Sequence, residues 1–184
     1  MALTFKPYGG LEGLLVVEGP YFPDERGFFF EAFRADEWAK QGLPPLVQDN
    51  LSRSKRGVVR GLHFQTPPAA IGKLVRCARG RIFDVAVDIR KASPTYGKSA
   101  GIELDDAGNR MFWVPAGFAH GFCALSDSAD VSYKVTGYWT KSVDGGIRWN
   151  DPALAIAWPI KASDAIVTAK DAALPLLADA ASPF

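Results

Sequence analysis

Apolar and aromatic residues recur along most of this chain in short runs separated by turn residues. The runs are rich in β-branched and aromatic side chains, and Gly, Pro, Asp and Asn bound them, which is typical of strands. They cover residues 14–22, 27–33, 58–65, 73–78, 81–89, 99–104, 110–115, 120–126, 130–140 and 145–149. So many short strands at near-regular spacing predict a mainly β protein, either a sandwich or a closed barrel.

Two segments interrupt this pattern with helical character. Residues 35–42 (ADEWAKQG) predict a short helix, and the chain becomes alanine-rich after residue 158. Residues 169–180 predict a helix that is interrupted near Pro175, since proline disrupts a helix interior. No linker, repeat or low-complexity tract divides the sequence, so we expect one domain over residues 1–184, with a C-terminal helical tail from about residue 160.

The run at residues 81–89 (RIFDVAVDI) alternates cleanly between two faces of a strand. One face carries Phe83, Val85, Val87 and Ile89, and the other carries Asp84, Ala86 and Asp88. Carboxylates on a buried strand are costly unless they meet water, a ligand or a partner charge. The segment therefore fits a barrel with a polar, ligand-binding interior, and equally an amphipathic strand whose acidic face is in solvent.

Charge and cysteine content narrow the class of protein. The formal net charge is +1, so no overall field attracts the chain to nucleic acid or to an acidic membrane. The basic cluster at residues 53–60 is too short for a nucleic-acid arm but suits a diphosphate. Cys77 and Cys123 both lie in apolar runs, which favours buried reduced thiols. With neither a signal peptide nor a transmembrane stretch in the sequence, we expect a cytoplasmic protein.

The two histidines lie in two short motifs within residues 57–125. His63 (in RGLHFQ) begins an HxH pattern in which Gln65 replaces the second histidine, and His120 (in PAGFAHGF) ends a PxGxxH pattern. This region resembles the cupin jelly-roll superfamily, in which Lys73 would stand at the usual glutamate position. The resemblance implies a cupin-type jelly-roll β-barrel, with a few short helices, that lacks half of the usual metal ligands.

The replacements change the chemistry expected of the barrel. A charged Lys73 repels a divalent cation, so we expect no metal. We also expect no other cofactor. The same ammonium can stabilise a developing oxyanion. A neutral histidine is suited to removing a proton beside a ketone, which would give an enolate. Inversion then needs an acid on the other face, for which Tyr133 and Tyr138 are candidates, although either could simply be a core residue.

Longer characteristic blocks occur in order from about residue 14 to residue 171: DERGFFFEAF, VQDNLSRSKRGVVRGLHFQ, GKLVRCARGRIFDVAVDIRKASPTYGK, VPAGFAHGF, YKVTGYW, GIRWNDPALAIAWP and AKD. Together these blocks resemble the dTDP-4-dehydrorhamnose 3,5-epimerases. The resemblance implies inversion of C3 and C5 of dTDP-4-dehydro-6-deoxy-D-glucose to give dTDP-4-dehydro-L-rhamnose, in dTDP-L-rhamnose biosynthesis.

The same resemblance implies roles for individual residues. His63 would accept the proton, Asp171 would orient its ring, Tyr133 would donate a proton, and Lys73 would hold the C4 oxygen. His120 would be a second pocket histidine, supported by Asp84, and Tyr138 would stack on thymine. Further binding positions are Arg26, Glu31, Gln48, Asn50, Arg60 and Lys170, where guanidinium groups suit phosphate oxygens. Asp144 departs from the family pattern, which usually has a longer glutamate there.

Several alternatives share these residues. A relative that inverts only one carbon, or acts on another deoxysugar nucleotide, needs the same base, acid and lysine. A ketoisomerase, a non-catalytic sugar-nucleotide-binding cupin and a metal-dependent cupin are the remaining classes. The resemblance also implies a homodimer in which an N-terminal strand joins the partner's sheet. Arg26 and Glu31 would then serve the neighbouring subunit's cavity.

Overall fold

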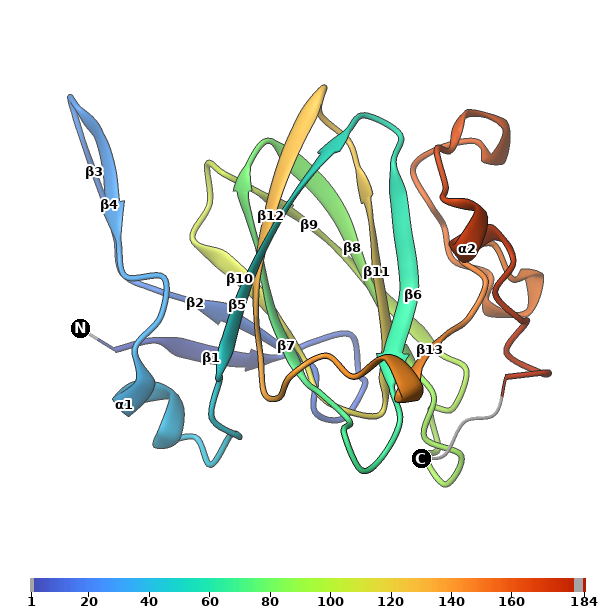
Figure 1. Cartoon of the computed structure of the whole chain (residues 1–184). Coiled ribbons are helices and arrows are strands. Elements are labelled where there is room, and N and C mark those ends of the chain that lie inside the picture. Colours follow the sequence, from blue (N-terminus) through green and yellow to red (C-terminus); the bar gives the residue numbers. More distant parts are fainter. Residues whose placement is uncertain (1, 181–183) are drawn as a thin grey trace.

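Two facing antiparallel sheets form the body of the protein (Figure 1). The computed structural model describes residues 2–180 and 184, so residues 1 and 181–183 of the expected domain lie outside the described residues. The six-stranded sheet contains, in spatial order, β1 (Thr4–Pro7), β2 (Leu15–Glu18), β10 (Arg110–Val114), β7 (Lys73–Arg79), β12 (Ser128–Val135) and β5 (Gln48–Lys55). The five-stranded sheet contains β13 (Asp144–Gly146), β6 (Val59–Gln65), β11 (Phe118–Ala124), β8 (Arg81–Asp88) and β9 (Ser99–Asp105). The predicted mainly β class is confirmed.

Every run predicted as a strand contains or overlaps one, but two strands were not predicted. The run at residues 14–22 divides at Gly19 and Pro20 into β2 and β3 (Tyr21–Asp24), the first strand of a separate hairpin. The unpredicted strands are β1 and β5, whose sequence QDNLSRSK is almost entirely polar. Strand β5 pairs with β12 along its whole length at the edge of its sheet. Its alternate residues line a cavity instead of a core, which removes the hydrophobic signal of a strand.

Apolar core residues cover both faces of the five-stranded sheet. The inner layer fills the space between the sheets and includes Ile82 and Ala86. The outer layer includes Val85, Val87 and Ile89. The alternation predicted for residues 81–89 is therefore real, and the face with Asp84 points toward the interior of the barrel.

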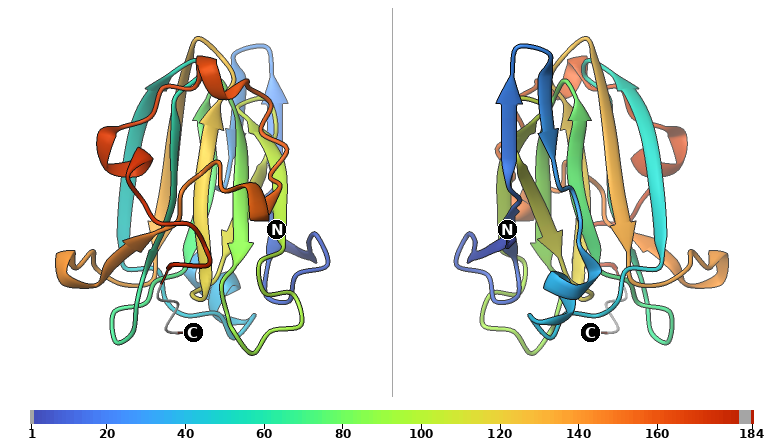
Figure 2. Two further views of the ribbon diagram at one scale, coloured as in Figure 1. Left: turned by 90° about the vertical axis from the view of Figure 1, so that its right-hand side faces the viewer. Right: turned by 90° about the vertical axis from the view of Figure 1, so that its left-hand side faces the viewer.

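Helical structure is sparse. The helix predicted over residues 35–42 is α1 (Ala35–Ala39), and single 3₁₀ turns occur at η1 (Lys141–Val143), η2 (Pro152–Leu154) and η3 (Ala162–Asp164). The longer helix predicted over residues 169–180 is wrong, because only α2 (Ala169–Ala172) forms. Pro175 disfavours helical geometry at Leu174 and cannot donate a backbone hydrogen bond. The C-terminal segment instead runs across the outer face of the five-stranded sheet (Figure 2).

The hairpin of β3 and β4 (Gly27–Phe30) projects away from the body (Figure 1). It carries exposed aromatic rings, among them Phe28 and Phe29. Among the described residues, no helix is long and apolar enough to cross a membrane.

Candidate active site

A cavity of about 470 Å³ opens between the two sheets. Side chains from β5, β7 and β12 form one wall, and side chains from β6 and β11 form the other. Ten of the residues implied by the family resemblance line it: Gln48, Asn50, Arg60, His63, Lys73, His120, Tyr133, Asp144, Lys170 and Asp171. Residues far apart in the sequence are thus brought together at one site.

His63 and Asp171 form a hydrogen-bonded pair within this cavity. The Nε2 atom of His63 lies 2.8 Å from Oδ1 of Asp171. The second carboxylate oxygen of Asp171 accepts the backbone N–H of Gly61 at 3.3 Å. Burial alone would raise the pKa of Asp171, but the hydrogen bonds from His63 and from the Gly61 N–H help to hold it below its usual value. Asp171 is therefore a carboxylate that accepts a proton-bearing Nε2, which leaves Nδ1 as the basic nitrogen of His63.

A bulge between β6 and β11 sets the position of His63. The register of the two strands shifts after the pair His120–His63, so that Phe122 pairs with Arg60. Gly61, with φ of 135°, packs directly on Gly121, and a Cβ on Gly61 would lie 2.6 Å from the Cα atom of Gly121. Two glycines at the contact permit this close approach, which brings the Gly61 N–H to Asp171.

Asp171 itself is held by the one-turn helix α2. The Thr168 hydroxyl caps this helix by accepting the Asp171 N–H at 3.1 Å. The spacing of Thr168 and Asp171 is that of a capping box, a local signal that agrees with the helix start predicted at residue 169. Thr168 also lines the cavity, and sequence reasoning missed it.

Lys73 reaches across the cavity from the opposite sheet. Its Nζ atom donates to the His63 carbonyl oxygen at 3.2 Å. Burial lowers the pKa of Lys73 to about 8, and the nearby carboxylates of Asp84 and Asp144 oppose that shift. At neutral pH the cavity therefore holds an ammonium group next to the His63 backbone.

His120 and Asp84 form a second pair, more deeply buried than the first. His120 Nε2 lies 2.8 Å from Asp84 Oδ1, and both residues are buried. Burial lowers the pKa of His120, although Asp84 opposes the shift. The other oxygen of Asp84 is buried with no hydrogen-bond partner among the described residues. Asp84 thus stands behind His120, outside the cavity lining.

Tyr133 lies on the wall opposite His63. Strand β12 pairs Tyr133 with Val75 and Val135 with Lys73, so Tyr133 and Lys73 share the inward face of their sheet. Burial raises the pKa of Tyr133, with a smaller opposing effect from Arg60. The phenol therefore keeps its proton at neutral pH.

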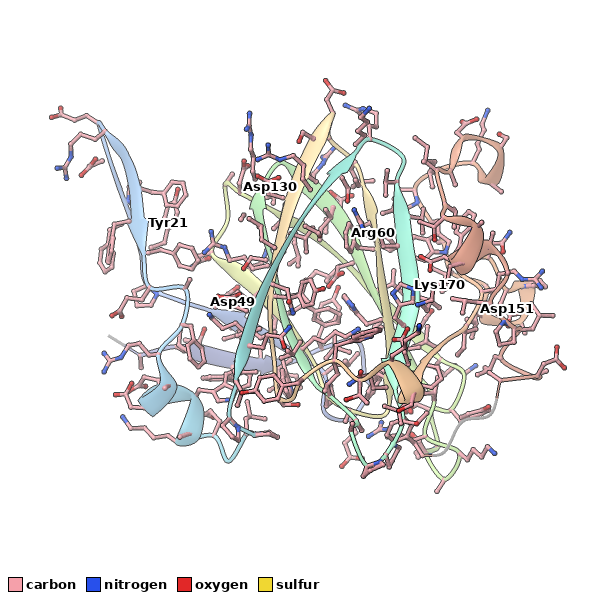
Figure 3. The ribbon with its side chains drawn as sticks, viewed as in Figure 1. Tyr21, Asp49, Arg60, Asp130, Asp151 and Lys170 are labelled. Carbon is pink, nitrogen blue, oxygen red and sulfur yellow. The ribbon has the colours of Figure 1, made fainter. Side chains whose placement is uncertain are left out.

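Polar side chains surround the cavity near its mouth. Gln48 Nε2 donates to Asn50 Oδ1 at 2.8 Å on β5. Arg60 is held against β5 by a bond of 3.0 Å from Nε to the Ser54 hydroxyl. Figure 3 shows Arg60 on the inner side of β6 and Lys170 on α2.

Asp144 and Lys170 form an ion pair at the same mouth. Lys170 Nζ lies 2.7 Å from Asp144 Oδ2, and this bond raises the pKa of Lys170. The shorter aspartate at this position therefore does contact another member of the expected binding set.

Three expected binding residues lie outside the cavity of this chain. Arg26 sits at the tip of the projecting hairpin, pairs with Asp24 and has an 86% exposed side chain. Glu31 follows β4 and does not line the cavity. Tyr138 is 68% exposed, whereas the adjacent Trp139 lines the cavity. No local pattern separated Trp139 from a core aromatic residue.

Fold and site together define a class of protein. The chain is a cupin-type barrel whose cavity has a His–Asp pair on one wall and, on the opposite wall, a lysine and a protonated tyrosine. These are the parts of a proton-transfer site. Among the described residues, no group of three or more His, Cys, Asp or Glu side chains is arranged to hold a metal ion.

Comparison with known proteins specifies the family. The family model described as dTDP-4-dehydrorhamnose 3,5-epimerase matches residues 9–179. The dTDP-4-dehydrorhamnose 3,5-epimerase of Salmonella typhimurium is 50% identical over 166 residues, which are 89% of this chain and 90% of that protein. The chain therefore belongs to the dTDP-4-dehydrorhamnose 3,5-epimerase family.

Two further relatives inform the choice of substrate and outcome. A dTDP-6-deoxy-D-glucose-3,5-epimerase from Legionella pneumophila, solved in complex with dTDP-4-keto-L-rhamnose, superposes with a TM-score of 0.90 at 43% identity, covering 96% of this chain and 93% of that one. The dTDP-4-dehydrorhamnose 3-epimerase of Streptomyces niveus is 43% identical over 152 residues, which are 82% of this chain and 73% of that protein.

Proposed function

We propose that this protein inverts C3 and C5 of dTDP-4-dehydro-6-deoxy-D-glucose and so forms dTDP-4-dehydro-L-rhamnose for dTDP-L-rhamnose biosynthesis. The observation that carries the proposal is the position of His63 and Tyr133 on opposite walls of one cavity. Removing a proton from one face of a carbon and returning one to the other face inverts that carbon. The Salmonella and Legionella relatives support the choice of substrate.

In the first step, Nδ1 of His63 accepts the proton on the carbon beside the C4 ketone, and the C–H electron pair forms an enolate. Asp171 accepts a hydrogen bond from Nε2 (2.8 Å) and stabilises the imidazolium that results. Lys73, whose ammonium lies next to the His63 carbonyl, stabilises the enolate oxygen.

In the second step, Tyr133 donates its phenolic proton to the opposite face of the same carbon. Its raised pKa keeps that proton available at neutral pH. The phenolate then regains a proton from water, and His63 releases its own. The same sequence at the second carbon completes the double inversion without any change in oxidation state, so the reaction needs no redox cofactor.

The nucleotide end of the substrate binds toward the polar mouth of the cavity. Arg60 and Lys170 supply positive charge for the diphosphate. Gln48 and Asn50 offer amide groups to the sugar or base, and Asp144 positions Lys170 through their 2.7 Å contact. His120, held by Asp84, forms the polar back wall.

The proposed product has a direct test. Incubation with dTDP-4-dehydro-6-deoxy-D-glucose, followed by proton NMR of the sugar ring couplings, should reveal inverted configuration at C3 and at C5. An unchanged ring would overturn the proposal.

A single-site 3-epimerase is the second candidate, which the Streptomyces niveus relative supports. It would need the same base, acid and lysine. The two candidates differ in the NMR spectrum of the product, since a 3-epimerase leaves the couplings at C5 unchanged.

The protein is further proposed to be a homodimer joined through its hairpin. An isolated two-stranded hairpin is only marginally stable in water, and this one exposes 50% of Phe28 and 66% of Phe29. Figure 3 shows Tyr21 on the same projecting element, well away from Arg60 and Lys170. Docking on a second copy would cover these rings and bring Arg26 and Glu31 toward the partner's cavity. Sedimentation should give a dimer that Phe29→Asp dissociates, and a monomeric wild type would contradict this.

We also propose a cytoplasmic location, because the two cysteines are free thiols. Cys77 and Cys123 are both buried free thiols, which suits a reducing compartment. Cell fractionation that places the protein outside the cytoplasm would contradict this.

A further inference from the structure

Gln65 lies at the end of β6 beside the cavity and is only 3% exposed. Its carboxamide oxygen accepts the Thr140 N–H at 2.5 Å. Its amide nitrogen donates to the Ala69 carbonyl at 2.8 Å and to the Tyr138 carbonyl at 3.3 Å. Both donor hydrogens and the acceptor of this side chain are thus engaged with the backbone of two neighbouring loops.

Two of these contacts bracket a single residue, Trp139. The Tyr138 carbonyl belongs to the peptide group before Trp139, and the Thr140 N–H belongs to the peptide group after it. The segment has no regular secondary structure at this point, so no ladder of strand hydrogen bonds holds it. The Gln65 side chain holds the peptide planes on both sides of Trp139 and so restrains the backbone position from which this side chain lines the cavity.

The loop that carries Trp139 is also tied to the loop before β7. Gly72 N–H donates to the Thr136 hydroxyl at 2.9 Å, and Thr136 N–H donates to the Gly72 carbonyl at 3.1 Å. Gln65 contacts Ala69 in the same loop. The wall of the cavity at this point therefore consists of two irregular segments, which the Gly72–Thr136 bonds and the buried Gln65 amide join.

Trp139 lines the cavity and is 57% exposed. A large flat ring at the edge of a polar cavity is suited to the face of a heteroaromatic base. We propose that Gln65 is a positioning residue for the nucleoside end of the substrate, and that it acts by holding Trp139 as an apolar wall for the base. This inference rests on the proposed function for the identity of the ligand.

If Gln65 has this role, replacing it should weaken nucleotide binding without slowing the chemical step. Gln65→Met keeps the volume of the side chain but removes all three hydrogen bonds. We expect the Kd for dTDP and the KM for the nucleotide sugar to rise about tenfold, the effect of losing one or two hydrogen bonds. The kcat should stay within about twofold, because Gln65 does not contact the reacting groups in this scheme.

A double-mutant cycle tests whether Gln65 acts through Trp139. Trp139→Ala alone should weaken dTDP binding, and Gln65→Met should have no further effect on Kd in that background. Asn109→Leu is the matched control, because Asn109 also donates a side-chain hydrogen bond to a backbone carbonyl, that of Gly19, and neither residue lines the cavity. It should leave Kd and KM unchanged even if it lowers the free energy of unfolding.

Three results would overturn the inference: an unchanged Kd for dTDP in Gln65→Met, a full additional loss in the Trp139→Ala background, or a fall in kcat with KM unchanged. Binding of dTDP involves no turnover. If the wild-type protein binds dTDP but does not invert the sugar, the proposed function fails while the test of Gln65 stands.

Discussion

Nε2 of His63 and Oδ1 of Asp171 lie 2.8 Å apart although 108 positions separate the two residues in the sequence. A glycine-lined bulge in β6 and a single helical turn at the C-terminal end bring them together. The contact determines which imidazole nitrogen carries a proton, and so which nitrogen can act as the base.

Asp171→Asn tests the consequence of this contact. The amide is nearly isosteric but cannot stabilise an imidazolium, and it can hold the wrong tautomer of His63. We expect kcat/KM to fall about 10²–10⁴-fold with little change in the Kd for dTDP. A loss of less than about fivefold, measured on protein with wild-type thermal stability, would contradict the assigned role.

The protonation of Lys73 determines how activity should change at alkaline pH. Burial lowers its pKa to about 8, and the scheme requires the protonated form. Activity should therefore fall as pH rises, because Lys73 loses its proton, and kcat/KM should decline above about pH 8. Lys73→Met should lower kcat about 10²–10³-fold and abolish that limb of the profile. Wild-type activity that is constant to pH 9.5 would count against an ammonium at the enolate oxygen.

Tyr133→Phe separates proton removal from inversion. His63 can still remove a proton and return deuterium to the same face, but no group donates to the opposite face. In heavy water, the substrate should take up deuterium while retaining its configuration, and product formation should fall about 10²–10⁴-fold. Equal losses of exchange and inversion would show that Tyr133 is needed before the proton is removed.

The buried carboxylate of Asp88 should make the stability of the fold depend on pH in acid. It is fully buried and accepts hydrogen bonds from Arg90, Ser93 and Thr95. Burial would raise the pKa of Asp88, but these bonds together hold it well below its usual value. The carboxylate therefore stabilises the fold at neutral pH, and this contribution is lost as pH falls below about 4.

Replacing Asp88 leaves the Arg90 charge unpaired. Asp88→Ala should lower the free energy of unfolding by about 3–5 kcal/mol, measured by urea denaturation at pH 7. Asp127→Ala is the control, since Asp127 forms an exposed ion pair with Arg56 and should cost less than about 1 kcal/mol. Equal losses in the two variants would refute the structural role of Asp88.

Local pattern was sufficient for elements that bury an apolar face. The alternation at residues 81–89 predicted a strand with acids on one side, and Asp84 does face the barrel interior and pair with His120. Strand β5 escaped prediction because its alternate residues face the cavity and are polar. The length of the C-terminal helix was overestimated. The alanine content favours a longer helix, but Pro175 and packing on the sheet end it at Ala172.

The site depended on information that no local pattern carries. The substitution of Lys73 for a metal ligand was visible in the sequence and indicated proton chemistry. The pairing of His63 with Asp171 came only from the family resemblance, because the contact crosses 108 positions. Trp139 could not be assigned to the cavity before the folded positions of Tyr138 and Thr140 were known.

The most direct measurement of the central claim is solvent deuterium uptake by dTDP-4-dehydro-6-deoxy-D-glucose, followed by proton NMR. With the wild-type protein, the signals of the C3 and C5 protons should both disappear. With His63→Asn, both should persist for at least about 10²–10⁴ times longer, although dTDP still binds. Persistence of both signals with the wild type, or equal exchange by the variant, would contradict the claim that His63 is the base of an epimerase.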